Sequence, residues 1–448
     1  SLDATTLTNE ITADAYGIFA DTKSDIDLNA GNSNNILAAK TTITDEDTGV
    51  SVDYGQQSAV YALSGSSVDL AAGEQNYLLG AVYANGTGTN VEVKGKDGST
   101  ATNVIRSHAA IANAGDIDTT TEGSEFKGKT FYSALYAEDG ANIKLDGNNI
   151  IGTWADSEDD YMLERTVWAY NEGTIDITGA AQIGTDRYDS SPNSADVAIA
   201  AGTATKLTKD IVDNYDETDN PRATVTVNYD DFKDENGVSI SKSNISGDIL
   251  SAYAGQVDIA TDNSEAGINI YGNLLAGNNG ILSVDLGKGG TLIGRADDYG
   301  DAGYVGNIEN EGDSNEHQNF YNPEFSSTIY SGGRVDLEMG AGSTWYVTGQ
   351  SWITSINTEK AQGDTKDTRA TIDLTTLYEN DEADATTAHA LTVYDFKGDA
   401  DFKMNLSGDR ANSDMLYMKH ADGTYRINLV DAVTTDEINS DQNGNEFS

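Results

Sequence analysis

Cysteine is absent from this chain of 448 residues, and only three residues are proline. Without cysteine the protein has no disulfide bonds and no thiolate ligands for a metal ion. Cysteine-free chains are common among bacterial proteins that stay unlocked until they have crossed the cell envelope. The composition therefore favours an exported protein whose fold depends on packing and hydrogen bonds.

Positive charge is also scarce. Against 74 Asp and Glu residues there are 26 Lys and Arg residues, and the formal net charge is -48. Contacts with nucleic-acid phosphates need clustered Lys and Arg, so nucleic acid is not expected as a partner. The negative charge favours solubility and repulsion between copies, so we expect a monomer.

Long apolar runs are missing too, since none approaches the roughly 18 residues of a transmembrane helix. No signal peptide is visible, and the abrupt ends lead us to expect an excised part of a longer protein. What is abundant is glycine, at 46 residues, together with Asp, Asn, Thr and Ser. This mixture suits short strands joined by turns, and 38% hydrophobic residues argue against disorder.

A short pattern recurs along the chain. Each copy opens with a bulky residue followed by Ala or Ser, and two apolar residues in alternation begin seven or eight positions later. The openings are Phe19-Ala20, Tyr61-Ala62, Tyr83-Ala84, Tyr136-Ala137, Trp168-Ala169, Leu250-Ser251 and Leu275-Ala276. The alternating pairs are Ile26/Leu28, Val68/Leu70, Val91/Val93, Ile143/Leu145, Ile175/Ile177, Val257/Ile259 and Leu282/Val284.

Alternation places apolar side chains on one face of a strand, and the glycine between the two parts permits a sharp bend. One repeat takes roughly 20 to 27 residues, which is typical of a solenoid turn. The sequence therefore predicts an all-β fold: a right-handed parallel β-helix of roughly 15 to 20 rungs with loop insertions. An antiparallel sandwich is the alternative, although it does not require a constant offset between the two parts.

Polar insertions interrupt the repeat. Three of them follow the related segments "GNNIIG", "GAAQIG" and "GGTLIG", near 153–165, 185–196 and 295–325. Their shared position in the repeat predicts that they leave from one corner of the rod. A further insertion, near 206–246, is expected to project as a separate arm.

These insertions carry many aromatic residues for polar segments, and Tyr and Trp are favoured contact residues. We therefore predict ligand binding by these rings, the alternative being that they fold back and cover the loops' own bases. The candidate residues are Trp154, Tyr161, Tyr188, Tyr299, Tyr304, Phe320 and Tyr321.

Catalytic and metal-binding patterns do not emerge. "EGDSNEH" (311–317) lacks the serine environment of a serine hydrolase, and the four histidines have no metal-ligand spacing. "DFKDENG" (231–237) fails the calcium-loop pattern, because Phe232 and Lys233 disrupt the register of the ligand positions. We expect no catalytic residue, no cofactor and no dedicated metal site, with adventitious calcium at the acidic surface as the open alternative.

The segment "DFKMNLSGDRANSDMLYMKHADGTYRINLVDA" (401–432) alternates strands with a turn at Ser413-Asp414 and a turn at Asp422-Gly423. It resembles the end of a monomeric autotransporter passenger domain, and the upstream repeats are similar to that family in style. The resemblance implies a β-helix passenger over 1–400 and autochaperone-like rungs over 401–448. It also implies display on the surface of a Gram-negative bacterium, attached to an outer-membrane β-barrel outside this sequence.

The expected function is adhesion to a host surface protein, a glycan or another bacterium, through the loops and a side face of the rod. The matched residues are structural, so the resemblance gives no catalytic residue. Two alternatives remain open: a polysaccharide lyase or glycosidase that uses carboxylates in a side cleft, and a passive stalk or self-association module.

Overall fold

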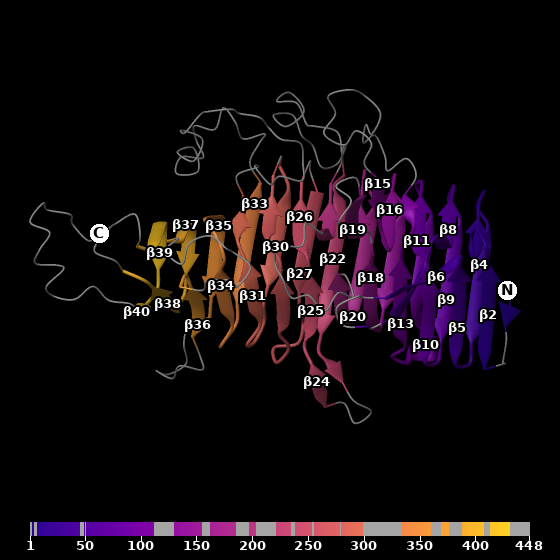
Figure 1. Ribbon diagram of the computed structural model, residues 1–448, viewed down its shortest axis with the longest axis horizontal. Helices are drawn as coiled ribbons and strands as arrows, with labels where there is room; N and C mark the ends of the chain where they lie inside the picture. The colour runs from indigo at the N-terminus through magenta and orange to yellow at the C-terminus, as the bar shows by residue number, and fades with distance from the viewer. Residues whose placement is uncertain are drawn as a thin grey trace, which may run out of the picture.

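The computed structural model describes residues 2–3, 7–44, 49, 51–111, 130–154, 162–184, 197–202, 221–233, 238–252, 255–277, 279–298, 333–359, 369–375, 388–406 and 413–430. Within these residues the chain coils as a parallel β-helix whose turns stack along one axis (Figure 1). The predicted parallel β-helix is confirmed. None of the described residues forms a helix that is long and apolar enough to cross a bilayer.

Each turn contributes strands to three walls, within which the strands pair in parallel. The first wall contains β3 (Ile18–Ala20), β8 (Ser58–Leu63), β11 (Ala81–Asn85), β16 (Leu135–Glu138), β19 (Met162–Ala169), β21 (Val197–Ala201), β26 (Asp248–Ser251), β29 (Leu274–Ala276), β32 (Ala296–Asp297) and the first halves of β35 (Ser351–Thr358), β37 (Ala390–Lys397) and β39 (Met415–Asp422).

The second wall follows the first within each turn. It contains β1 (Leu2–Asp3), β4 (Asp25–Ala30), β9 (Ser67–Ala72), β12 (Asn90–Gly95), β17 (Asn142–Asp146), the first part of β20 (Thr174–Gly184), β22 (Ala223–Asp230), β27 (Gly255–Ala260), β30 (Ile281–Asp285), β33 (Arg334–Met339) and the second halves of β35, β37 and β39.

The third wall closes each turn. It contains β2 (Thr8–Ala13), β5 (Ser33–Ala38), β10 (Gln75–Leu79), β13 (Thr102–Ser107), β18 (Asn148–Thr153), the second part of β20, β25 (Ser243–Ser246), β28 (Ile268–Tyr271), β31 (Thr291–Gly294), β34 (Thr344–Val347), β36 (Ala370–Asp373), β38 (Ala400–Met404) and β40 (Tyr425–Leu429).

These are thirteen third-wall strands within the described part of the chain, fewer than the roughly 15 to 20 rungs expected for the whole sequence. At a strand spacing of about 4.8 Å the thirteen strands span about 60 Å.

The register of the walls reproduces the sequence repeat. Tyr83 pairs with Tyr61 on one side and with Tyr136 on the other, and in the second wall Val91 pairs with Val68 and Ile143. The alternating pairs of the second wall point inward, as predicted. Together with Ile151 of the third wall they belong to one continuous buried core. Parallel pairing rules out the antiparallel sandwich.

Asparagines form a polar row within this apolar interior. Asn9 donates to Asn34, and the side-chain amides continue through Asn76, Asn103 and Asn149 at N–O distances of 2.8 to 2.9 Å. The last four of these residues are fully buried. Asn149 closes the row by donating to backbone carbonyls, among them that of Thr178 at 3.0 Å. The row is satisfied in hydrogen bonding, which is the condition for burying amides.

The predicted corner glycines lie at corners. Gly140, between the first and second walls, has φ +77°, and Gly147, between the second and third walls, has φ +138°. A Cβ at Gly147 would lie 2.3 Å from the carbonyl oxygen of Ala101. Only glycine therefore fits this corner without a shift of the neighbouring turn.

Three antiparallel hairpins interrupt the repeat within the described residues. They are β6–β7 (Lys40–Thr44 and Ser51–Gly55), β14–β15 (Ala110–Ile111 and Thr130–Tyr132) and β23–β24 (Phe232–Lys233 and Ser239–Ser241). The last lies within the insertion expected near 206–246. That range is more divided than expected, because β22 and β25 on either side of the hairpin belong to the walls.

The ends of the three aromatic insertions do not share one corner. Those near 153–165 and 185–196 follow β18 and β20, at the end of the third wall. The insertion near 295–325 leaves from the end of the first wall, because Ala296 and Asp297 form β32 there. The prediction of a common corner is therefore wrong for the third insertion. A strand of two residues carries no alternation that would reveal it in the sequence.

Candidate functional site

Of the seven predicted binding residues, Trp154 is the one that the structure describes. Tyr161, Tyr188, Tyr299, Tyr304, Phe320 and Tyr321 lie outside the described residues. Trp154 is half-buried at the end of the third wall, where its backbone N–H donates to the carbonyl of Ser107 at 3.0 Å. Its ring lies 4.8 Å from that of His108, whose Nδ1 is 2.8 Å from the Trp154 carbonyl oxygen. For Trp154 these contacts support the alternative reading, in which the ring packs against the base of its own loop.

A second group of aromatic residues, those that open the repeat, was not predicted as a binding site from the sequence. The bulky residues that open the repeat point outward from the first wall and stack from turn to turn. Ring centroids are 5.9 Å apart from Phe19 to Tyr61, 4.5 Å from Tyr61 to Tyr83, 5.5 Å from Tyr83 to Tyr136 and 4.9 Å from Tyr136 to Trp168. We call these five residues the aromatic column.

Parallel in-register strands account for the column. Each ring is carried at the same position of successive first-wall strands, so the backbone fixes the rings roughly one strand spacing apart. Phe19 and Tyr61 are nearly parallel, with an interplanar angle of 7°, and Tyr61 and Tyr83 follow at 13°. The rings are thus held by the scaffold and need little ordering before they meet a ligand.

Exposure along the column has a gradient. Trp168 and Tyr136 are buried, and they belong to a cluster with Phe131 of the β14–β15 hairpin. At the other end Phe19 is 52% exposed. Tyr16, which is 43% exposed, lies 4.6 Å from Tyr61 and 5.7 Å from Phe19. We call Tyr16, Phe19 and Tyr61 the aromatic patch.

Beneath the buried part of the column lies one carboxylate, Glu138. It accepts hydrogen bonds from the hydroxyls of Tyr83 and Tyr136, the second at 2.7 Å, and from the side-chain amide of Asn85. Burial raises the pKa of both tyrosines, and the adjacent Glu138 raises each further. Both hydroxyls therefore stay protonated as donors at any physiological pH, and they fix the orientation of their rings.

A cation stabilises the far end of the column. The guanidinium carbon of Arg165 lies 4.4 Å from the ring centroid of Trp168 and 5.0 Å from that of Phe131. Arg165 is itself almost fully buried. These contacts hold the Phe131 ring against Trp168 at the buried end of the column. Among the described residues, the exposed end of the column is the one that belongs to the aromatic patch.

A different kind of site begins where the third aromatic insertion leaves the first wall. Asp297 and Asp298 are both buried there, and the Thr354 hydroxyl donates to Oδ2 of Asp298 at 2.7 Å. Oδ1 of Asp298 is buried without a hydrogen-bond partner. Burial, reinforced by the neighbouring Asp297, raises the pKa of Asp298 to about 8, although the Thr354 bond opposes the shift. Asp298 is therefore a neutral acid at pH 7.

Within the part of the chain that is described, no three His, Asp or Glu side chains are placed to hold a metal ion together. Comparisons with protein-family models, curated proteins and solved structures find no significant match. The fold, the aromatic column and the buried acid therefore carry the functional inference.

Proposed function

We propose that this protein is an adhesin of the monomeric autotransporter type, a rod that binds a host surface protein, a glycan or another bacterium without catalysis. In this proposal it is displayed outside the cell and attached to an outer-membrane β-barrel. It acts as a monomer and needs no cofactor.

The aromatic patch is the observation that carries this proposal. Tyr16, Phe19 and Tyr61 place large, partly exposed rings side by side on the outside of a stiff wall. Aromatic side chains dominate the energetics of recognition surfaces. Rings that are already stacked lose little conformational entropy on binding. Exposed aromatic rings that lie together on a protein surface commonly mark an interaction site.

The C-terminal turns support the second half of the proposal. In the segment that resembles the autotransporter family, β38, β39 and β40 continue the three walls. Asp414, in the turn before β39, accepts the backbone N–H groups of His389 at 2.9 Å and Asn405 at 2.7 Å. A turn that is hydrogen-bonded to its neighbour in this way is consistent with the stable, autochaperone-like end that the resemblance implies.

The test is binding of the 448-residue chain to glycan arrays, matrix proteins and bacterial cells, compared with the Tyr16→Ala/Phe19→Ala double variant. We expect the variant to bind its ligand about 30-fold more weakly, the effect of losing a hot-spot contact. Ile427→Ser/Leu429→Ser serves as the control, because these apolar residues of β40 are 60% and 45% exposed at the other end of the rod. Equal binding by all three proteins would remove the patch as the site.

The loop residues need a separate variant. The Asp298 carbonyl accepts a hydrogen bond from the Gly333 N–H at 2.8 Å, so a short Gly-Ser linker can replace 299–332 without opening the wall. This variant removes Tyr299, Tyr304, Phe320 and Tyr321 together. A loss of binding here, with the patch variant unaffected, would move the adhesive site to the insertion.

Asp298 favours one alternative function, an enzyme that cleaves polysaccharides. A carboxylic acid that stays protonated at pH 7 is suited to act as a general acid. The discriminating measurement is depolymerisation of a uronate polysaccharide by the purified chain. Activity that disappears in the Asp298→Asn variant would replace the adhesin proposal, whereas inactivity of the unchanged chain would reject the enzyme.

A further inference from the structure

The second and third walls of the rod differ in charge. Every second-wall strand from β4 to β33 carries at least one Asp or Glu. The third-wall strands from β5 to β34, with the second part of β20, carry none, and Arg106 is the one charged residue in them. A chain with a net charge of -48 therefore keeps one wall of its rod almost free of charge.

Four neighbouring strands of this wall, β25, β28, β31 and β34, form one continuous surface. Their core-facing residues include Ile245, Ile270, Leu292 and Trp345. The residues that alternate with these face outward, and parallel pairing arranges them in two rows along the rod. The first row is Asn244, Asn269, Thr291 and Thr344, and the second row is Ser246, Tyr271, Ile293 and Tyr346. We call these eight residues the neutral face.

The spacing within the second row is regular. Tyr271 pairs with Ile293, and Ile293 pairs with Tyr346. Neighbouring strands lie about 4.8 Å apart, so the backbones of the two tyrosines are about 10 Å apart, the length of one disaccharide in an extended sugar chain. Every side chain of the neutral face is half-buried, none fully buried. A glycan lying along the rod axis would therefore meet a tyrosine at every second sugar ring.

The residue types of the neutral face suit an uncharged glycan. Asn side chains and the hydroxyls of Ser, Thr and Tyr both donate and accept hydrogen bonds, as sugar hydroxyls do. Aromatic rings offer a large apolar surface for the C–H groups of a sugar ring. Ile293 is the one aliphatic residue of the face, whereas the centre of a protein–protein interface is richer in apolar residues. A charged ligand would meet no opposite charge on these two rows.

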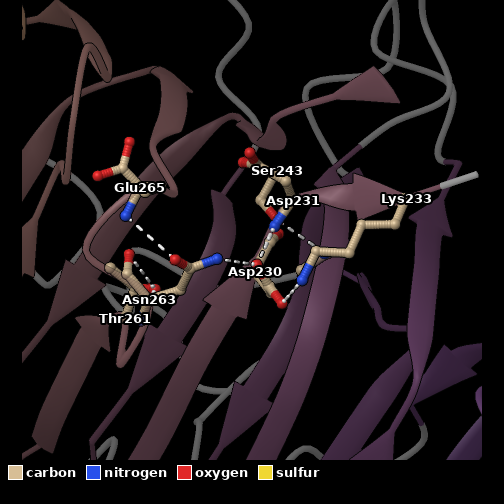
Figure 2. A network of polar contacts seen from close by, with 8 residues as sticks. Asp230, Asp231, Lys233, Ser243, Thr261, Asn263 and Glu265 are labelled. Carbon is tan, nitrogen blue, oxygen red and sulfur yellow. Dashed lines mark hydrogen bonds and ion pairs between the residues drawn. The ribbon is translucent and has the colours of Figure 1, made fainter. Parts of the chain in front are cut away.

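A polar network holds the corner beside the neutral face (Figure 2). Asp230 accepts hydrogen bonds from Lys233 and from the backbone N–H of Asp231, the second at 2.8 Å. Asn263 of the next turn donates to the same carboxylate at 2.8 Å. Burial opposes ionisation of Asp230, but these donors outweigh it and keep its pKa below the usual value. The Ser243 hydroxyl donates to the Asp230 carbonyl, so the network also fixes the start of β25.

The neutral face ends at β36. There Asp373 takes the place of Tyr346 in the second row. It forms an ion pair with Lys403 at 2.8 Å. The charges named at the two borders are thus paired within the protein, and the face between them is held on a rigid frame.

We propose that the neutral face binds an extended, uncharged glycan that lies along the rod axis. In this arrangement Tyr271 and Tyr346 pack against sugar rings, and the row from Asn244 to Thr344 hydrogen-bonds to sugar hydroxyls. The neutral face belongs to the third wall, whereas Phe19 and Tyr61 of the aromatic patch belong to the first. The inference therefore concerns a second site and does not rest on the adhesin proposal.

The test is isothermal titration of the full chain with neutral β-1,4-linked hexasaccharides: cellohexaose, chitohexaose and mannohexaose. We expect saturable binding of at least one of them, with a Kd that rises about tenfold or more in the Tyr271→Ala/Tyr346→Ala variant, which loses the ring contacts. The matched control is Tyr16→Ala/Phe19→Ala, which removes two exposed rings from the aromatic patch and should bind as the unchanged chain does. Failure of all these sugars to bind would overturn the proposal.

A second variant guards against misfolding of the first. Thr291→Val/Thr344→Val keeps the shape of the first row but removes two hydroxyls, so it should weaken binding severalfold. Binding that is unchanged in both variants would overturn the proposal. Binding lost in the aromatic-patch control alone would also overturn it, and would support the adhesin proposal instead.

Salt and self-association separate this site from other kinds of contact. The Kd should stay constant between about 50 mM and about 500 mM NaCl, because neither the face nor the sugar is charged. A steep loss of affinity with salt would show that charge attracts the ligand, against the proposal. A dimer in sedimentation that Tyr271→Ala/Tyr346→Ala abolishes would likewise overturn it, because the face would then join two copies of the chain.

Discussion

At the scale of single residues, two buried polar groups distinguish this rod from a simple hydrocarbon core. The asparagine row is fully paired, whereas Oδ1 of Asp298 is buried without a partner. Hydrogen bonds between amides are stronger in a low-dielectric interior than in water. Ionisation of an unpaired buried acid there costs free energy, so the acid stays neutral. Substitutions at these two kinds of position should therefore have opposite effects on stability.

Replacing Asn103 by Leu should destabilise the middle of the row by about 2 to 4 kcal/mol, because the amides of Asn76 and Asn149 each lose a partner. Local hydrogen exchange in β10, β13 and β18 is the suitable measurement, since a long repeat protein need not unfold in one step. The control is Asn35→Leu, beside the row on the half-exposed face of β5. Equal protection in the two variants would contradict a role for the row.

Replacing Asp298 by Asn should change how stability depends on pH. In the unfolded chain this carboxyl ionises above its ordinary pKa of 3.8, but in the folded protein it stays protonated up to about 8. The folded state therefore binds one more proton between these values, and stability falls by about 1.4 kcal/mol for each pH unit of rise across that window. The variant lacks this loss.

The measurement is the difference in thermal midpoint between the unchanged chain and the Asp298→Asn variant at several pH values from about 5 to about 8. The advantage of the variant should grow as the pH rises and level off above about 8. Asp97→Asn, an exposed position, provides the control slope. A constant difference across this range would show that Asp298 is already ionised in the folded protein.

At the scale of elements, the corners decide which substitutions the turns tolerate. Gly140 and Gly147 bound the same strand, β17, yet their surroundings differ. At Gly140 the nearest atom to an added Cβ is the Thr87 hydroxyl at 3.1 Å, whereas at Gly147 it is a backbone carbonyl oxygen at 2.3 Å. A side-chain hydroxyl can turn aside, but a carbonyl oxygen paired within a wall cannot.

Gly147→Ala should therefore cost several times more stability than Gly140→Ala. The second change adds mainly the strain of a left-handed conformation, of the order of 1 kcal/mol. Urea denaturation of both variants, monitored by tryptophan fluorescence with Trp168 as the nearby probe, would compare their stabilities. Similar midpoints would mean that the neighbouring turns move apart more easily than the close approach at Gly147 implies.

The last described turn depends on Asp414. Its carboxylate joins the backbone of His389 to that of Asn405, and burial raises its pKa against these two bonds. Asp414→Ala should leave both N–H groups unpaired and increase hydrogen exchange in β39 and β40 first, by about 1 to 3 kcal/mol in protection. The exposed Asp422→Ala is the control. A uniform change along the rod would contradict a local role.

At the scale of the whole molecule, the net charge of -48 destabilises the compact state, because like charges repel one another. Only 26 basic residues offset the acidic ones, and several of them, such as Lys94 between Asp69 and Glu92, are already engaged in ion pairs. Mutual repulsion between like charges is screened by salt. The thermal midpoint should therefore rise between about 20 mM and about 500 mM NaCl. A midpoint that falls would point to stabilising pairs as the larger effect.

The sequence reveals the architecture better than it reveals the site. Alternation in pairs such as Ile143/Leu145 predicts the inward face, and the constant offset to Tyr136 predicts the parallel register. The asparagine row was missed because each Asn stands at the start of a strand and looks like a turn residue. The aromatic column was missed for another reason: the same residues mark the repeat, and one sequence does not say which side of a strand they occupy.

The asparagine row also gives the stack a built-in direction. Every amide in it donates to the next one along the chain, from Asn9 toward Asn149, so the side-chain dipoles run head to tail. A turn that joined the stack one residue out of step would set an amide against hydrocarbon and break the series. Within this part of the stack, the row therefore favours the correct register of each turn on its neighbour.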